Sequence, residues 1–181
     1  MDVILASSRG KGILPILRDL HPSPHHLMLN PTSGATIAEL TDQAITIIRK
    51  AKNPRDYHFY FIGGYCDITH RMQRTMNLSG RAVFNEEITF QEDPDVTVAR
   101  LSQIIATSSD RIKSYGAIPI FCTIAPSSLH TWNHTRLSQK KTSHLEHFNN
   151  YPHMQENLIQ AIIRTNQVIN EMNETNQVAT P

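Results

Sequence analysis

The chain alternates short apolar runs with longer segments whose apolar residues recur at helical spacing, and this alternation restricts the fold more than any other feature. The apolar runs of strand length are Asp2–Ala6, His26–Leu29, Tyr57–Ile62 and Ile118–Ile124. Apolar residues at helical spacing predict helices over 13–20, 37–51, 94–115 and 158–172. Regular alternation of this kind predicts a parallel sheet with helices on both faces. We therefore expect a three-layer α/β/α sandwich, flavodoxin-like, with about four or five strands.

Local signals mark where two of these helices begin. Thr36, with Glu39 three residues later, has the pattern of a capping box, and Asp93-Pro94 suits an N-cap and a first helical position. Residues 68–92 follow no such pattern and predict a long excursion that contains a small hairpin. A modest basic cluster within it suits either a solvated face or the binding of a phosphate or a carboxylate. The cluster consists of Arg71, Arg74 and Arg81.

Length and composition favour one domain inside the cell. The 181 residues allow one sizeable core, so we interpret 1–175 as a single domain and 176–181 as a tail, where a fifth strand would begin. The net charge of +1, from 17 basic and 16 acidic residues, does not indicate a nucleic-acid partner. No apolar run approaches the roughly 20 residues of a membrane span, and no signal peptide is recognisable. We expect an intracellular, cytoplasmic protein; its two cysteines exclude a disulfide scaffold.

Four loops follow the predicted strands and would meet at one edge of the sheet. In parallel α/β sheets, ligands bind outside the carboxyl ends of the strands. We therefore expect any active or binding site to be built from these loops. They are Ser7–Gly12, Asn30–Gly34, Gly63–Asp67 and Ala125–Ser128.

Each loop carries a candidate functional residue with a purely structural alternative. Ser8 lies between a buried strand and a helix, where its hydroxyl either acts as a nucleophile beside helix amides or caps the helix. Gly34 allows close approach of a ligand to the backbone, or forms an ordinary turn. Asp67 suits a polar pocket or caps the segment after it. Cys66 is a candidate thiol nucleophile or a small buried side chain. The glycines of Arg9–Gly12 do not complete a phosphate-binding loop, so no nucleotide cofactor is expected.

The order of these loops resembles that of the SGNH (GDSL-type) hydrolases. Ala6-Ser7-Ser8 corresponds to the family's Gly-Asp-Ser block, which implies that Ser8 is the nucleophile. Ser33-Gly34-Ala35-Thr36-Ile37 is similar to the second block and implies that Gly34 donates to the oxyanion. Gly64-Tyr65-Cys66-Asp67 lies on the third, Gly-x-Asn-Asp. The second and third blocks are most similar to SGNH-like segments in open reading frames of animal retroelements. The resemblance covers roughly residues 2 to 170.

The sequence departs from the family pattern at several places. Cys66 replaces the oxyanion asparagine, and loss of one such donor costs about a hundredfold or more in rate. Ser7 replaces the aspartate of the first block. The Asp-x-x-His block that supplies the family's general base is missing near the end of the chain. Asp19-Leu20-His21-Pro22 has its spacing but lies at the far end of the first helix, away from Ser8.

A histidine-rich segment follows the fourth strand and offers substitutes for the missing base. The candidates for the proton acceptor of Ser8 are His130, His144 and His153. Histidine pairs at helical spacing occur in the segment, but no cysteine or carboxylate completes a familiar zinc pattern, so no metal is expected. The alternative is a solvated loop or lid. Trp132 lies in the same segment and either lines a pocket or packs in the core.

Three functions are compatible with these features. The first is a serine esterase or acyl hydrolase with an impaired site, which takes a small ester or acyl substrate. The second is a catalytically inactive SGNH-like binding or assembly module of a retroelement-type polyprotein. The third, a flavodoxin-like phosphate-binding domain, shares the architecture but lacks the loops.

Overall fold

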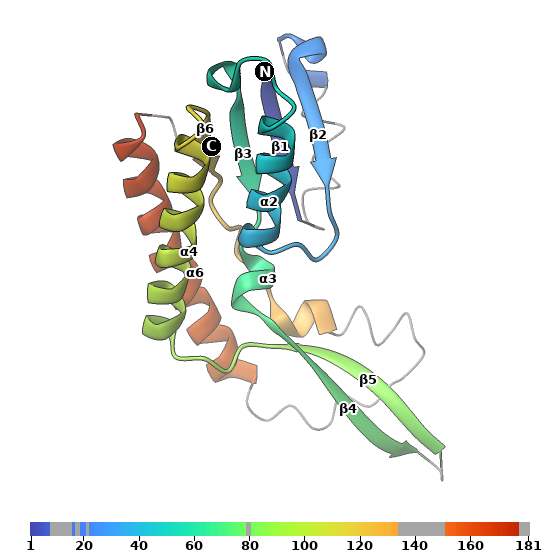
Figure 1. Cartoon of the computed structure of the whole chain (residues 1–181). Helices are drawn as coiled ribbons and strands as arrows, with labels where there is room; N and C mark the ends of the chain where they lie inside the picture. The colour runs from blue at the N-terminus through green and yellow to red at the C-terminus, as the bar shows by residue number, and fades with distance from the viewer. Residues whose placement is uncertain (8–15, 17–18, 21, 79–80, 134–150, 178–181) are drawn as a thin grey trace.

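Four parallel strands form the central sheet of the computed structural model. The structure describes all residues except 8–15, 17–18, 21, 79–80, 134–150 and 178–181. For residues 24, 72–87 and 151 it describes only the backbone. The strands pair in the order β2-β1-β3-β6 and all run in the same direction (Figure 1). The predicted parallel sheet is confirmed. The strands are β1 (Asp2–Ala6), β2 (Leu27–Pro31), β3 (His58–Ile62) and β6 (Ile118–Phe121).

Three long helices pack beside the sheet. They are α2 (Ile37–Ile48), α4 (Pro94–Lys113) and α6 (Tyr151–Thr175). The capping box at the start of α2 is confirmed, because the Glu39 N–H donates to Thr36 Oγ1 and the Thr36 N–H donates to Glu39 Oε2. Asp93 caps α4 by accepting from the Asp95 N–H at 2.7 Å. Short 3₁₀ turns at Pro24–His26 (η2) and Pro54–Asp56 (η3) precede β2 and β3.

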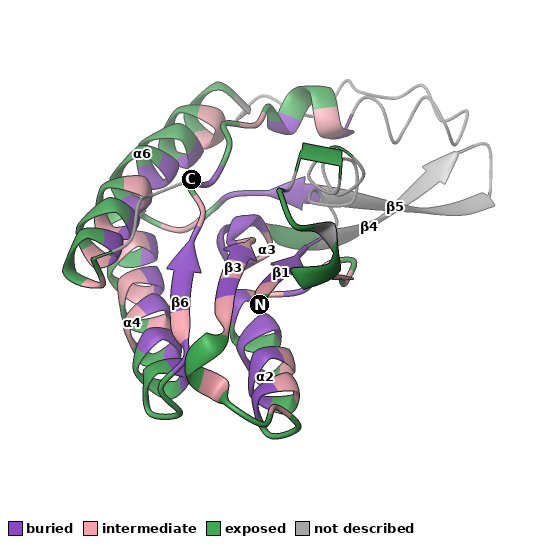
Figure 2. Cartoon of the chain, turned by 90° about the horizontal axis from the view of Figure 1, so that it is seen from above, coloured by how far each residue is buried: buried purple, intermediate pink, exposed green. Residues whose placement is uncertain are grey.

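The main core lies between the sheet and these helices. Phe59 and Phe61 of β3 point into it, and Phe61 stacks on Phe121 of β6 with ring centroids 4.8 Å apart. Figure 2 shows the buried positions of α2, α4 and α6 on the sides that face the strands. The opposite face of the sheet carries a smaller apolar cluster around Ile4 and Ala6. The predicted helix over 13–20 falls mostly outside the described residues, and those of its residues that are described are helical.

The excursion after β3 is a hairpin longer than expected. The short helix α3 (Tyr65–Ile68) leads into β4 (His70–Leu78), which pairs antiparallel with β5 (Arg81–Thr89). The hairpin projects from the carboxyl edge of the central sheet (Figure 1). Because His70 pairs with Thr89, both ends of the excursion return to the same place. The base of the hairpin therefore lies beside the loops in which we expected a site.

Several boundaries differ from the sequence-based expectation. The last strand ends at Phe121 rather than at Ile124, because Asn166 of α6 takes both backbone groups of Ile124. The strand expected over His26–Leu29 runs from Leu27 to Pro31 instead. The final helix begins at Tyr151 and continues to Thr175, so Asn173 lies inside it and is fully buried, where we expected the helix to decay. No helix among the described residues is long and apolar enough to cross a membrane.

Candidate functional site

A pocket of about 370 Å³ opens at the carboxyl edge of the sheet, where the four loops were expected to meet. The loops after β1, β2 and β3, the base of the hairpin and the helical residues 129–133 all contribute to it. A pocket of this volume is at the lower end of the range for small-molecule sites, about 300–1,000 Å³. The described residues that line it are Ser7, Ser33, Gly34, Tyr65, Cys66, Thr69, Arg71, Ile88 and Trp132.

Backbone hydrogen bonds hold the first two loops against the sheet. The N–H of the buried residue Ser7 donates to the Ile62 carbonyl of β3 at 2.9 Å. The Thr32 N–H donates to the Ala6 carbonyl of β1 at 2.7 Å. The turn that follows brings Gly34 to the pocket with φ of +78°, a conformation that favours glycine. These loops are therefore extensions of the strands, which fixes one side of the pocket.

The end of β3 supplies a second side of the pocket. Gly64 has φ of +95° and caps α3, whose first two residues, Tyr65 and Cys66, both line the pocket. Tyr65 lies against Trp132 from the helical residues 129–133, with ring centroids 6.4 Å apart and planes tilted by 43°. The pocket consequently has an aromatic wall, to which Ile88 from the base of the hairpin adds an aliphatic side chain.

Asn133 ties this wall to the hairpin. Its side chain is buried and accepts from the Ile88 N–H at 2.9 Å while donating to the Ile88 carbonyl at 2.8 Å. An amide side chain thus makes the same two bonds that a neighbouring strand would make. The pair connects residues 45 positions apart in the chain and sets the distance between the base of β5 and Trp132.

Asp67 is turned away from the pocket and holds the start of α2. The residue is 7% exposed, and its carboxylate accepts from the Ile37 N–H at 3.0 Å through Oδ2 and 3.3 Å through Oδ1. Ile37 is the first residue of α2, where unpaired N–H groups and the helix dipole favour a negative charge. Burial nevertheless dominates and raises the pKa of Asp67 from 3.8 to about 6. Asp67 is therefore a structural link between α3 (Tyr65–Ile68) and α2.

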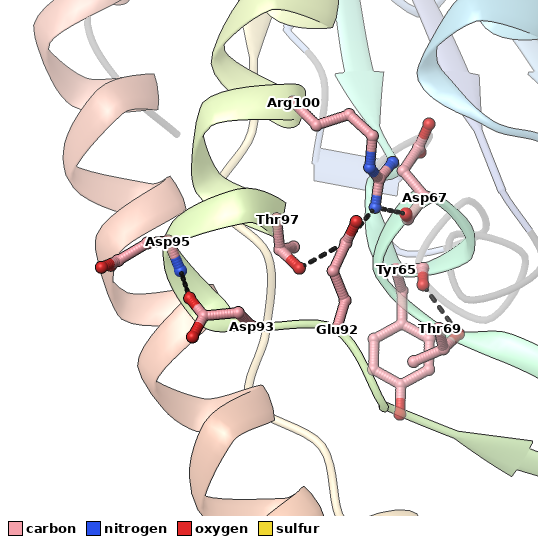
Figure 3. A network of polar contacts seen from close by, with 8 residues as sticks. All are labelled: Tyr65, Asp67, Thr69, Glu92, Asp93, Asp95, Thr97 and Arg100. Atoms are coloured by element: carbon pink, nitrogen blue, oxygen red, sulfur yellow. Dashed lines mark hydrogen bonds and ion pairs between the residues drawn. The ribbon is translucent and has the colours of Figure 1, made fainter.

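The backbone of Asp67 is fixed by an arginine of α4. The Arg100 guanidinium donates to the Asp67 carbonyl and to Glu92 Oε2, both at 2.8 Å, and Figure 3 shows it between them. The Thr97 hydroxyl donates to the same Glu92 carboxylate at 2.6 Å. The hydrogen bond from Arg100 is the main reason that the pKa of Glu92 lies below its usual value. This network joins the exit of the hairpin, α4 and α3.

The candidate residues named from the sequence fall into three groups. Gly34 and Cys66 line the pocket, as does Trp132. Asp67 is not among the described lining residues, and His130 and His153 are exposed side chains outside that lining. Ser8 and His144 lie outside the described residues. Sequence reasoning did not place Thr69 or Ile88 at the site, and it treated Arg71 only as part of a basic cluster. The signal that could have placed these three residues at the site was their position at the two ends of the expected hairpin.

Neither cysteine is in a disulfide, and the two have different surroundings. Cys66 is half-buried at the pocket. Cys122 follows β6, and burial raises the pKa of its thiol to about 12. Among the described residues, no group of three or more histidine, cysteine, aspartate or glutamate side chains is arranged to hold a metal ion.

We expect Asp67 to make the stability of the protein depend on pH. The carboxyl titrates near 3.8 in the unfolded chain and near 6 in the folded protein. Between these values the folded protein keeps a proton that the unfolded chain has lost, so stability falls as pH rises through this window and then levels off. The fall attributable to Asp67 is up to about 3 kcal/mol.

Urea unfolding of the wild type and of Asp67→Asn at about pH 4 and about pH 7 measures this contribution. The wild type is expected to lose up to about 3 kcal/mol more than Asp67→Asn between the two conditions, because the amide does not titrate. Asp110→Asn removes an exposed carboxyl from α4 and is expected to keep the wild-type profile. Equal pH profiles for the wild type and Asp67→Asn would contradict the assignment.

Comparisons with known proteins identify the fold. No family model matches the sequence, and no curated protein matches it. A GDSL-like lipase from Bacteroides thetaiotaomicron superposes with a TM-score of 0.55 and 12% sequence identity, over 99% of this chain and 66% of the lipase chain. A protein from Bacteroides fragilis assigned as an acylhydrolase superposes with a TM-score of 0.56 and 13% identity, over 99% of this chain and 65% of that chain.

These likenesses concern the fold. The chain spans slightly less than two thirds of the length of each of the two proteins. The four-stranded parallel sheet with its helices is the α/β architecture that the resemblance to the SGNH hydrolases implied, and GDSL-like proteins are its structural neighbours. The order of the sequence blocks therefore predicted the architecture correctly.

Proposed function

We propose that this chain is an SGNH-like acyl-ester hydrolase domain with a weakened active site at the pocket. The observation that carries the proposal is the convergence of three strand-end loops on one pocket that has an aromatic wall. Ser8 is the next residue after Ser7, which lines that pocket. The GDSL-like lipase and the acylhydrolase assignment of the structural neighbours favour the same class of reaction.

In the proposed reaction, the Ser8 hydroxyl attacks the carbonyl carbon of an ester. The N–H groups of Ser8 and Gly34 stabilise the negative charge that develops on the carbonyl oxygen. A histidine accepts the Ser8 proton and passes it to the departing alcohol, which leaves an acyl group on Ser8. Water then attacks the acyl group, releases the carboxylic acid and restores the hydroxyl.

Two features lead us to expect slow turnover. The thiol of Cys66 stands where the family has an amide donor, and a thiol is a poor donor to an oxyanion. Of the three candidate bases, the two that the structure describes, His130 and His153, are exposed and absent from the described pocket lining.

The second candidate function is a binding or assembly module that has lost hydrolysis, as in a retroelement-type polyprotein. It is favoured by one observation: no histidine or carboxylate occurs among the described residues that line the pocket. A nucleophile without a general base would leave a pocket that binds an acyl compound without cleaving it.

A fluorophosphonate probe and a nitrophenyl butyrate assay on the purified chain separate the two functions. If the domain is a hydrolase, the probe labels the wild type but not Ser8→Ala. Ester hydrolysis by Ser8→Ala then falls to the rate of uncatalysed hydrolysis in buffer. Separate alanine variants of the three histidines then identify the base. If the probe does not label the wild type and its rate equals that of Ser8→Ala, the hydrolase proposal is wrong.

Cys66→Asn provides the complementary gain-of-function arm of this experiment. Restoring the amide donor is expected to raise kcat by about a hundredfold, because the loss of one oxyanion donor costs about that factor or more. Cys66→Ala is the matched control, since it removes the thiol without supplying a donor. An inactive binding module would show no gain with either variant.

A further inference from the structure

One of the described residues that line the pocket is positively charged, and it is in no ion pair with another described residue. Arg71 lies near the start of β4 and lines the pocket beside Thr69. One of its guanidinium nitrogens, Nη2, lies 3.7 Å from the position that a Cβ would take at Gly34. The guanidinium therefore lies over the turn that follows β2.

Three other arginines of the described chain are paired with carboxylates, whereas the exposed Arg49 and Arg55 are in no ion pair between described residues. Arg100 pairs with Glu92 and Arg111 with Asp42, both at 2.8 Å, and Arg164 pairs with Asp95. None of the ion pairs between described residues uses Arg71. The nearest acidic residue in the sequence, Asp67, directs its carboxylate to the Ile37 N–H instead.

The remaining lining of the pocket combines polar and apolar side chains. Hydroxyl groups of Ser7, Ser33 and Thr69 accompany Arg71, and no acidic side chain occurs among the described lining residues. Tyr65, Trp132 and Ile88 supply the apolar part of the lining, and Ile88 is the cross-strand partner of Arg71 in the hairpin. A guanidinium with neighbouring hydroxyls suits a carboxylate or a phosphate, because its planar donors make paired, charge-assisted hydrogen bonds with anionic oxygens.

We infer that the ligand of this pocket carries an anionic carboxylate or phosphate group bound by Arg71, and an apolar chain that lies against Tyr65, Ile88 and Trp132. The inference deepens the proposed function by naming the substrate class, a short acyl compound with a negative charge. Anion binding depends on Arg71 and not on Ser8, so it holds or fails separately from hydrolysis.

Binding of three matched probes by the purified full chain tests this inference. Hexanoate carries a carboxylate, hexyl phosphate carries a phosphate, and hexanamide is a neutral compound with a chain of the same length. None of them is an ester, so the chemistry of Ser8 is not involved. Calorimetry measures the affinities, and the fluorescence of Trp132, the single tryptophan of the chain, reports binding at the pocket.

Arg71→Met is expected to weaken binding of the preferred anion by about tenfold or more and to leave hexanamide unchanged. The control, Arg49→Met, makes the same charge change at an exposed residue at the other end of α2 and is expected to bind like the wild type. Arg71→Gln is a second neutral variant if Arg71→Met does not fold, as judged by thermal unfolding. The preference between hexanoate and hexyl phosphate decides which anion the pocket recognises.

Three outcomes would overturn the inference. They are equal anion affinity in the wild type and the neutral Arg71 variants, binding of hexanamide as tight as that of both anions, and no binding of either anion to the wild type. If the fluorophosphonate probe does not label the wild type but the anion still binds in an Arg71-dependent way, the hydrolase proposal is wrong and the anion site stands.

Discussion

Asn173→Ala is expected to lower the free energy of unfolding by about 3 kcal/mol, although the substituted side chain lies near the end of the last helix. The Asn173 amide donates to the Phe121 carbonyl at 2.7 Å and accepts from the Phe121 N–H at 3.2 Å. Phe121 belongs to β6, the outermost strand of the sheet. The N–H groups of Ile118 and Cys122 donate to the carbonyls of Tyr57 and Phe61, on the side of β3. Because successive residues of a strand direct their backbone groups to opposite sides, those of Phe121 point to the open edge of the sheet.

The loss is large because alanine leaves a buried N–H and a buried carbonyl unpaired. Each unsatisfied buried group costs about 1–3 kcal/mol. For a domain of this length, about 3 kcal/mol corresponds to a fall in Tm of roughly 6–12 °C. Asn170→Ala is the control, since Asn170 is exposed on the same helix and is expected to change stability little. Similar urea midpoints for the two variants would contradict the edge-capping role.

Two other amide side chains of α6, those of Asn166 and Gln155, bind the backbone of the segment that follows β6 in the same way. Asn166 makes the same paired contact with Ile124, at 2.7 and 3.0 Å, and Gln155 binds the Leu129 N–H and the Ser127 carbonyl. Spacings of seven and eleven residues place all three amides on one side of the helix. A helix thereby satisfies the edge of the sheet that a fifth strand would otherwise cover.

Gly64→Ala is expected to destabilise the protein by a similar amount, about 3 kcal/mol, and to displace the pocket wall. At φ of +95°, a residue with a Cβ is strained by about 1–2 kcal/mol. An added Cβ would also lie 2.6 Å from Ile124 Cδ1 and 3.1 Å from its Cγ1. Ile124 is almost fully buried, so moving it disturbs neighbours and costs roughly another 1–3 kcal/mol.

Gly63→Ala is the matched control for this prediction. Gly63 does not have a positive φ, and an added Cβ would lie 3.1 Å from the end of the Leu40 side chain, which shifts more easily than backbone. Thermal unfolding is expected to show a clearly smaller loss for Gly63→Ala. Because Gly64 precedes Tyr65 and Cys66, Gly64→Ala is also expected to change the fluorescence of Trp132 in the folded protein. Equal losses of Tm in the two alanine variants would show that the strain at Gly64 is not important.

Asp67 and Arg71 illustrate how far the site could be predicted. The sequence left Asp67 either in a polar pocket or as a cap of the segment that follows it, whereas its carboxylate binds the N-terminus of α2, thirty residues earlier in the chain. It indicated a basic cluster in the excursion, but not which arginine would reach the site. The path from α3 into β4 places Arg71 over the turn at Gly34, and the pairing of β4 with β5 returns Ile88 to the position opposite it.

The sequence by itself determined the parallel sheet and the edge at which the pocket opens. These features follow from periodicity and from turn and capping residues, which act over a few positions of the chain. The tertiary structure alone decided the partners of the buried polar groups. Asn173 resembled the fraying end of a helix because its partner, the backbone of Phe121, lies 52 residues away. A buried amide must find a partner wherever the fold provides one, and no local pattern records which backbone that will be.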